Sequence, residues 1–287
     1  MMRRMMPPHA RLVSTTQVFW QVGVFISFIC AFLVSTMSGA TGGRVVFAIL
    51  AVFAVIAWAW RVFSPTFRRF HEEADARDAA RPATSYNTGK TSVMKVLFGA
   101  DKKVLLTYFL AIVIFYVGWN LLANTWGQFQ TYMFSKAGAT QSLATGLGII
   151  LNLVTLVLNI VFASIAGGKY RNKAFFVGII ISVIAMIAMA MGGANLWVIV
   201  GATAFMNLGS PLAGEALYKV WTQESFPIEI RASVQGFING FSRLCCGLFA
   251  LITPALVLPE TIQATMWCFA AIVVVEGIAG TVMIRAQ

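Results

Sequence analysis

Long apolar runs alternate with short polar breaks along most of the chain. A bilayer core of about 30 Å needs roughly 20 apolar residues in a helix, and eight runs are long enough. They cover about residues 16–37, 45–63, 104–124, 141–166, 174–192, 196–217, 233–257 and 262–284. Gly or Pro residues mark most of the breaks between them. The pattern therefore predicts an all-α, polytopic membrane protein with about eight transmembrane helices.

One polar stretch is much longer than the other breaks. Residues 64–103 mix both charge signs, with two apolar runs before them and six after them. This composition is typical of a solvated, partly helical linker between two groups of transmembrane helices. The sequence GKTS at 89–92 lies within it, but Thr84 stands where a phosphate-binding loop needs glycine. We therefore do not expect nucleotide binding there.

Composition and charge support a membrane setting. The chain is 59% hydrophobic and 11% charged, with a net charge of +11, whereas soluble domains carry about 25% charged residues. Such a charge would suggest nucleic acid as the partner of a soluble protein. Here the bilayer is the expected partner and nucleic acid is not, because cytoplasmic loops of membrane proteins collect Lys and Arg.

The distribution of basic residues predicts the orientation. With the N-terminus inside, the outside segments hold only Arg44 and Lys136, and all the other basic clusters fall inside. Both ends are therefore expected in the cytoplasm of a multi-pass protein of the cell membrane. The two histidines, His9 and His71, lie outside the apolar runs, and no nucleophile–base pair or metal cluster stands out. We therefore expect no enzyme activity, no catalytic residue, no metal and no cofactor.

The stretch ESFPIEIRASVQG carries a family resemblance. It resembles the sugar-porter signature of the major facilitator superfamily, Glu-x-Phe-Pro-x-x-x-Arg-x-x-x-x-Gly, in the loop after the tenth span. Glu224, Phe226, Pro227, Arg231 and Gly236 match it at the right spacing.

Other stretches resemble the family less completely. Arg11 and Gln17 match the start of its fifth span, although Leu12 replaces a glycine. Gly118 and Asn120 match the Gly-x-Asn of its seventh span, without the usual preceding Gln-Gln pair. The resemblance thus covers spans five to twelve of a twelve-span fold.

This alignment implies three parts. Residues 1–63 would be the last two helices of the N-terminal half, 64–103 the cytoplasmic linker, and 104–287 the complete six-helix C-terminal half.

The signature loop predicts a cytoplasmic gate. Glu224 and Arg231 can pair with each other or with the neighbouring GGKYRNK loop, where Lys169 and Arg171 lie. Pairs that form in one state and open in another would bias an alternating-access equilibrium. The alternative is a static anchor of the topology.

Polar residues within the runs are the candidates for substrate binding, since they are costly in lipid. The resemblance places Gln17 and Asn120 where sugar porters hydrogen-bond a sugar. The other candidates are the aromatic Tyr116, the amide Asn239 of the eleventh span and the guanidinium of Arg243. Amides offer a donor and an acceptor together, and aromatic rings stack on sugar faces. The alternative for any single Asn is packing between helices.

Glu215 and Arg243 are predicted at similar depths in the tenth and eleventh spans. We expect them to pair, with Pro211 bending the tenth helix towards Arg243. In the functional interpretation Glu215 is the proton-coupling residue, while the alternative is a permanent structural ion pair.

These features favour a secondary active transporter of a sugar or polyol, coupled to protons. The alternative is an organic-acid or metabolite transporter of the same superfamily, which the intramembrane Arg243 favours. Because the chain would lack the first four spans, an inactive fragment also stays open, and the 287-residue chain alone is expected not to transport.

Overall fold

The computed structural model describes residues 7–35, 37, 39–79, 102–192, 195–256, 258 and 260–287, and across these residues it contains helices and no strand. The prediction of an all-α, polytopic membrane protein is confirmed. The chain forms two compact units, one of residues 1–29 with 93–287 and one of residues 30–92. The cavity described below lies wholly in the larger unit.

The smaller unit contains one apolar and one polar helix. Helix α2 (Gly39–Phe63) is long and apolar enough to cross a membrane. Helix α3 (Pro65–Ala79) carries the sequence PTFRRFHEEADARDA and begins where Pro65 interrupts the apolar run. The predicted linker is thus helical over its first part, and the GKTS stretch lies outside the described residues.

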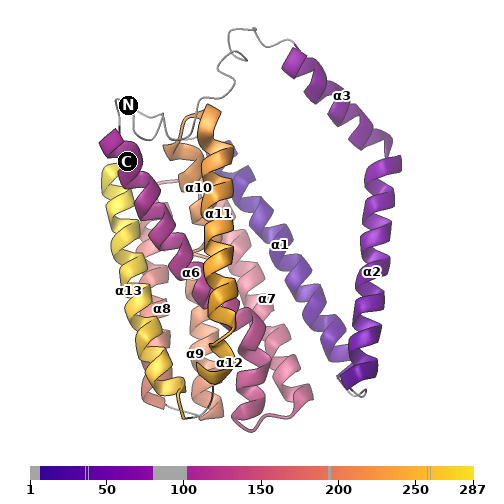
Figure 1. The fold of residues 1–287 in the computed structure, drawn as a ribbon, viewed down its shortest axis with the longest axis vertical. Helices are drawn as coiled ribbons and strands as arrows, with labels where there is room; N and C mark the ends of the chain where they lie inside the picture. Colours follow the sequence, from indigo (N-terminus) through magenta and orange to yellow (C-terminus); the bar gives the residue numbers. More distant parts are fainter. Residues whose placement is uncertain are drawn as a thin grey trace. The chain divides into compact units, whose positions relative to one another are not determined.

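Four long helices and most of a fifth give the larger unit its frame. They are α1 (Pro7–Leu33, in this unit up to Ile29), α6 (Lys102–Lys136), α7 (Gln141–Ile165), α8 (Arg171–Gly192) and α13 (Ile262–Ala286). Helix α13 packs against both α6 and α8, and it runs alongside them in Figure 1. Each of the five has the length and apolarity of a membrane span.

The remaining two predicted spans take a different form. The run at 196–217 is divided between α9 (Leu196–Gly209) and α10 (Glu215–Ser225), and the run at 233–257 lies mainly in α11 (Ile228–Ala250), followed by the short α12 (Thr253–Leu256). Six helices of the described residues therefore meet the length and hydropathy of a span. The other two runs do not meet these criteria. The run at 196–217 is broken between α9 and α10, and α11 is rich in polar residues.

The break between α9 and α10 has a local cause and a packing cause. Pro211 has no N–H to donate and its ring clashes with the preceding turn, so α9 ends at Gly209. At the same place α8 approaches very closely: a Cβ on Gly178 would lie 2.8 Å from the carbonyl oxygen of Gly209. The bend predicted near Pro211 is thus a complete interruption of the helix.

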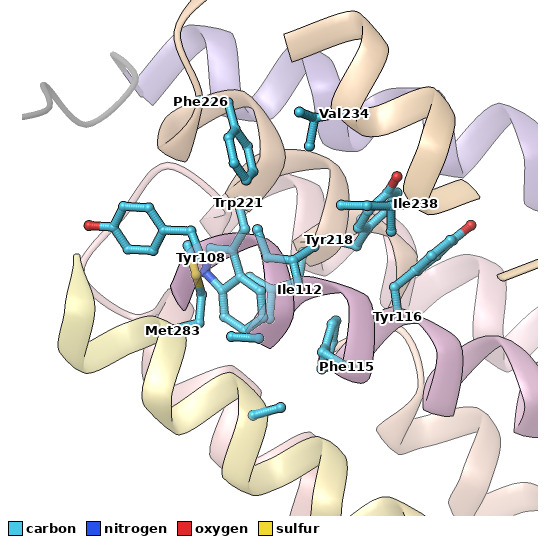
Figure 2. Close-up of a cluster of buried hydrophobic side chains, with 14 of the residues drawn as sticks. Tyr108, Ile112, Phe115, Tyr116, Tyr218, Trp221, Phe226, Val234, Ile238 and Met283 are labelled. Carbon is cyan, nitrogen blue, oxygen red and sulfur yellow. The ribbon is translucent and has the colours of Figure 1, made fainter. Parts of the chain in front are cut away.

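The core beside α10 is aromatic. Phe115 of α6, Phe175 of α8 and Trp221 of α10 meet edge to face, with ring centroids 5.0–6.1 Å apart. All three side chains are fully buried, and Figure 2 shows Phe115 and Trp221 among Ile112, Met283 and their neighbours. Edge-to-face aromatic pairs add to the stabilisation from buried area. This cluster fixes α10 against α6 and α8, and so positions the polar residues of α10.

Candidate functional site

A cavity of about 310 Å³ with both polar and apolar lining residues lies within the larger unit. Its size is at the lower end of the range of small-molecule sites, about 300–1,000 Å³. The polar residues of its lining come from α1, α6, α7, the α9–α10 region and α11: Gln17, Gln21, Asn120, Asn124, Gln130, Asn152, Thr155, Asn207, Ser210, Glu215 and Arg243. Among these polar residues most are neutral amides, with one carboxylate and one guanidinium, and apolar side chains such as Trp20, Phe28 and Trp119 complete the lining.

Gln17 and Glu215 meet through a residue that the sequence analysis did not assign to the site. Lys219 Nζ donates a hydrogen bond to Gln17 Oε1 at 3.0 Å and forms an ion pair with Glu215 Oε1 at 3.2 Å. The lysine and glutamate side chains are 20% and 14% exposed, and Gln17 is buried. One ammonium group therefore links α10 to α1 at the edge of the cavity.

This arrangement corrects the expected pairing of Glu215. Its ion-pair partner is Lys219, one helical turn on, and no ion pair joins Glu215 to Arg243 across the described residues. The i,i+4 spacing puts Lys219 on the same face of α10 as Glu215. Arg243 is on α11 and exposed, and it lines the same cavity.

A second contact joins α1 to α7. Gln21 Nε2 donates to Asn152 Oδ1 at 3.0 Å, and both side chains are buried. Asn152 Nδ2 in turn donates to the carbonyl of Gly148. This pairing was not predicted, although Gln21 follows Gln17 by one helical turn and therefore shares its face.

A third polar group lies between α6 and α11. Asn120 Nδ2 donates to Ser242 Oγ at 2.7 Å, and Asn124 Nδ2 donates to Asn120 Oδ1 at 2.6 Å. Asn120 is 1% exposed and lines the cavity. The hydrogen-bonding capacity of Asn120 is thus largely used within the protein, which leaves both its packing and its binding roles open.

Gln130 differs from the other amides. Its Nε2 is buried and has no hydrogen-bond partner in the described part of the chain, although the residue lines the cavity. Buried donors are almost always satisfied by protein, water or ligand. Gln130 is therefore a buried amide of the lining with an unpaired donor to offer.

Tyr116 and Asn239 lie outside the cavity lining. Tyr116 OH donates to Asn239 Oδ1 at 3.5 Å, and its buried ring stacks on Tyr218 with centroids 3.8 Å apart. Asn239 is exposed on α11. These two residues contact each other rather than the cavity, and their assignment to substrate binding stays a prediction.

Two of the four residues predicted to form a gate meet between the beginning of α8 and the end of α10. Arg171 Nη1 pairs with Glu224 Oε1 at 2.8 Å, with both side chains almost completely buried. Gln287 Nε2 also donates to Glu224 at 3.4 Å. Glu224 was expected to pair either with Arg231 or with the loop around Arg171, and in the structure it pairs with Arg171.

The other two gate residues make different contacts. Arg231 donates to the carbonyl of Phe226, and Lys169 lies over the exposed ring of Tyr170. Neither contributes to the Arg171–Glu224 pair. Their role in gating stays a prediction.

Comparison with known proteins agrees with this description. A family model described as "Sugar (and other) transporter" matches residues 5–285. The chain is also similar to the "Minor myo-inositol transporter IolF" of Bacillus subtilis (strain 168), with 26% identity over 255 residues. That match covers 86% of this chain and 56% of the relative, so the chain spans about half the length of the curated relative that it matches.

Proposed function

The chain belongs to the sugar (and other) transporter family, and on that premise we propose that it serves secondary active transport of a sugar or polyol across the cell membrane. The observation that carries the proposal is the set of Gln and Asn side chains, from α1, α6, α7 and α9, that converge on one cavity. A polyol presents hydroxyl groups that donate and accept hydrogen bonds in many directions, and amides do the same. The substrate named for the relative, myo-inositol, is a polyol.

The proposed division of the chain gives the Lys219–Gln17 bond a role. In that division α1 belongs to the N-terminal half and α10 to the C-terminal half, and substrates of such transporters bind between the halves. Lys219 donates across this boundary while it is paired with Glu215. Movement of one half against the other requires this bond to break, so the three residues form the proposed coupling centre.

Glu215 is the proposed proton acceptor of this centre. Protonation would remove the negative charge that holds Lys219 at 3.2 Å. The ammonium group would then be free to turn towards other acceptors, including substrate hydroxyls. Proton binding and substrate binding would thereby act on the same lysine.

Two asparagines of α7 provide the test of the binding site. Asn152 and Asn159 are seven residues apart, both are buried, and each donates to the carbonyl four residues before it. Only Asn152 belongs to the cavity lining. We expect Asn152→Leu to weaken binding of labelled myo-inositol to the purified chain in lipid nanodiscs, and Asn159→Leu to leave it unchanged. Equal binding by both variants and the parent would refute the site.

An organic acid is the second candidate substrate, because Arg243 lines the cavity without an ion-pair partner in the described part of the chain. A carboxylate would pair with this guanidinium. In a competition assay we expect unlabelled myo-inositol, and not succinate, to displace the bound polyol. Displacement by succinate that Arg243→Gln abolishes would favour the organic acid instead.

Binding is the appropriate first measurement because it depends on the cavity alone. Uptake also requires alternating access, for which both halves of such a fold move.

We propose that both ends of the chain lie in the cytoplasm, because of the charge distribution described above. Accessibility of a cysteine introduced at Gln287 to an impermeant reagent, compared in sealed vesicles of each orientation, tests this.

A further inference from the structure

A carboxyl group lies buried on the far side of α6 from the cavity. Glu276 of α13 is 3% exposed, and its Oε1 has no hydrogen-bond partner among the residues that the structure describes. The chain around it reads IVVVEGIAG, so it stands alone in an apolar stretch. None of the interactions described above uses this residue.

The Glu276 side chain rests on the backbone of α6 at Gly118. A Cβ added to Gly118 would lie 2.7 Å from Cγ and 2.8 Å from Oε1 of Glu276. Any side chain at this position would therefore displace the carboxyl group. Glycine makes room for Glu276, and the two residues form one contact between α6 and α13.

The helices packed around Glu276 supply no counter-charge. Helix α13 packs mainly against α6 and α8. The other ionisable side chains on these three helices are Lys102, Lys103, Tyr108, Tyr116, Tyr132 and Lys136 of α6, Arg171 and Lys173 of α8, and Cys268 and Arg285 of α13.

The side chains that could pair with Glu276 lie too far along their helices or interact with other residues. The residue of α8 at this level is Ile179, which contacts Gly277, and Arg171 lies eight residues earlier and pairs with Glu224. Tyr116 points to Asn239. Arg285 is nine residues beyond Glu276, roughly 13 Å along the axis at 1.5 Å per residue. Within the described residues, no positive charge therefore neutralises a carboxylate at this position.

From this geometry we infer that Glu276 is a proton-binding site and that its carboxyl group holds a proton at neutral pH while it lies against Gly118. An ionised carboxylate without a donor or a counter-charge is strongly unfavourable in a protein interior at membrane depth. The neutral acid is compatible with the apolar contacts that surround it. Release of the proton requires water to reach the carboxyl group, and hence separation of α13 from α6.

The site is connected to the cavity through α6. At 3.6 residues per turn, positions 118 and 120 lie about 200° apart around a helix, so Gly118 faces α13 while Asn120 faces the cavity. A change in the contact between α13 and α6 therefore acts on the helix that carries Trp119, Asn120 and Asn124. The inference concerns a proton and does not depend on the identity of the substrate.

Infrared spectroscopy of the chain in lipid nanodiscs tests the inference, because a protonated carboxylic acid has a C=O stretch that a carboxylate lacks. At neutral pH we expect this band in the parent chain and in Glu260→Gln, where the altered residue is exposed in a connecting segment. We expect it to be absent from Glu276→Gln, which keeps the shape of the neutral acid. Identical spectra of the parent chain and folded Glu276→Gln would overturn the inference.

A second measurement covers the case in which Glu276→Gln does not fold. Incorporation of ¹³C-labelled glutamate shifts the C=O stretch of any protonated glutamic acid in the parent chain. The complete absence of a shifted band at neutral pH overturns the inference. A shifted band that Gly118→Ala moves or removes supports it, because the added methyl group occupies the place of the carboxyl group while Glu276 itself is unchanged.

Discussion

The amide of Gln130 lines the cavity with a buried Nε2 that has no hydrogen-bond partner. Replacement by Leu removes an unsatisfied donor, so we expect the thermal stability of the chain to stay the same or to rise. If Gln130 donates to the polyol, loss of that bond costs about 1.4 kcal/mol, which is about a tenfold weaker affinity. Calorimetric titration with myo-inositol, together with thermal unfolding, measures both effects. A loss of stability with unchanged affinity would make Gln130 a packing residue.

Lys219 offers a second prediction at the residue scale. Lys219→Met removes the partner of Glu215 and the donor to Gln17. Because both charged side chains are partly exposed, we expect a loss of about 1–3 kcal/mol in the free energy of unfolding. The double variant Glu215→Gln, Lys219→Met leaves no unpaired charge and should recover part of the loss. Strictly additive effects would show that the two side chains are not coupled.

Single residues of the site were only partly predictable from the sequence. Gln17 and Asn120 were named because they are polar residues in apolar runs and the resemblance to sugar porters places them at sugar-binding positions, and both line the cavity. Lys219 was not considered for the site, because the predicted apolar run ended at residue 217. Its i,i+4 spacing from Glu215 was the available signal, and it becomes informative only once α10 is known to be a separate helix that begins at Glu215.

At the scale of helices, the approach of α8 to the end of α9 depends on glycine. A Cβ at Gly178 would meet the carbonyl of Gly209 and the Cβ of Leu212, at 2.8 and 2.9 Å. We expect Gly178→Ala to lower the free energy of unfolding by about 1–3 kcal/mol, because the backbone has to shift. Thermal unfolding measures the change.

Gly201 in the middle of α9 is the matched control. A Cβ there would meet nothing within 4 Å. Gly201→Ala should therefore stabilise the helix by about 0.5–1 kcal/mol, since alanine loses less backbone entropy than glycine. Opposite signs for the two variants are expected. Equal destabilisation would mean that helix packing does not account for the cost at Gly178.

Helices as elements were predictable where apolar runs were continuous. The runs at 141–166 and 174–192 correspond closely to α7 and α8. Hydropathy did not separate α9 from α10, because the interrupting residues are themselves mostly small or apolar. Pro211 indicated a bend, whereas the complete break also depends on the close packing of α8, which lies outside the local sequence.

For the molecule as a whole, the Arg171–Glu224 pair joins the beginning of α8 to the end of α10. Both side chains are nearly fully buried. Arg171→Gln leaves the carboxylate without its partner, and we expect a loss of about 3–5 kcal/mol in the free energy of unfolding. The charge-reversed double variant Arg171→Glu, Glu224→Arg should unfold at a higher temperature than either single reversal. A double variant no more stable than the single ones would show that the geometry, rather than the opposite charges, matters here.

Contacts between distant parts of the chain were the least predictable. The sequence indicated that Glu224 would meet either Arg231 or the loop around Arg171, and only the packing of α8 on α10 decides between them. Likewise, Gln21 and Asn152 are 131 residues apart, and nothing local indicates their hydrogen bond. The overall division of the chain into halves stays a prediction.

The interruption at Pro211 also bears on how the chain enters the membrane during synthesis. Helix α9 has 14 residues, or about 21 Å at 1.5 Å per residue, which is shorter than a bilayer core of about 30 Å. Helix α10, EALYKVWTQES, is too polar to leave a translocation channel for lipid unaided. Because the backbone groups between these helices also need partners, we expect this segment to remain at the channel until it docks against α8. Since α8 precedes this segment in the chain, integration of the tenth span would then be a step that depends on docking to a helix already synthesised.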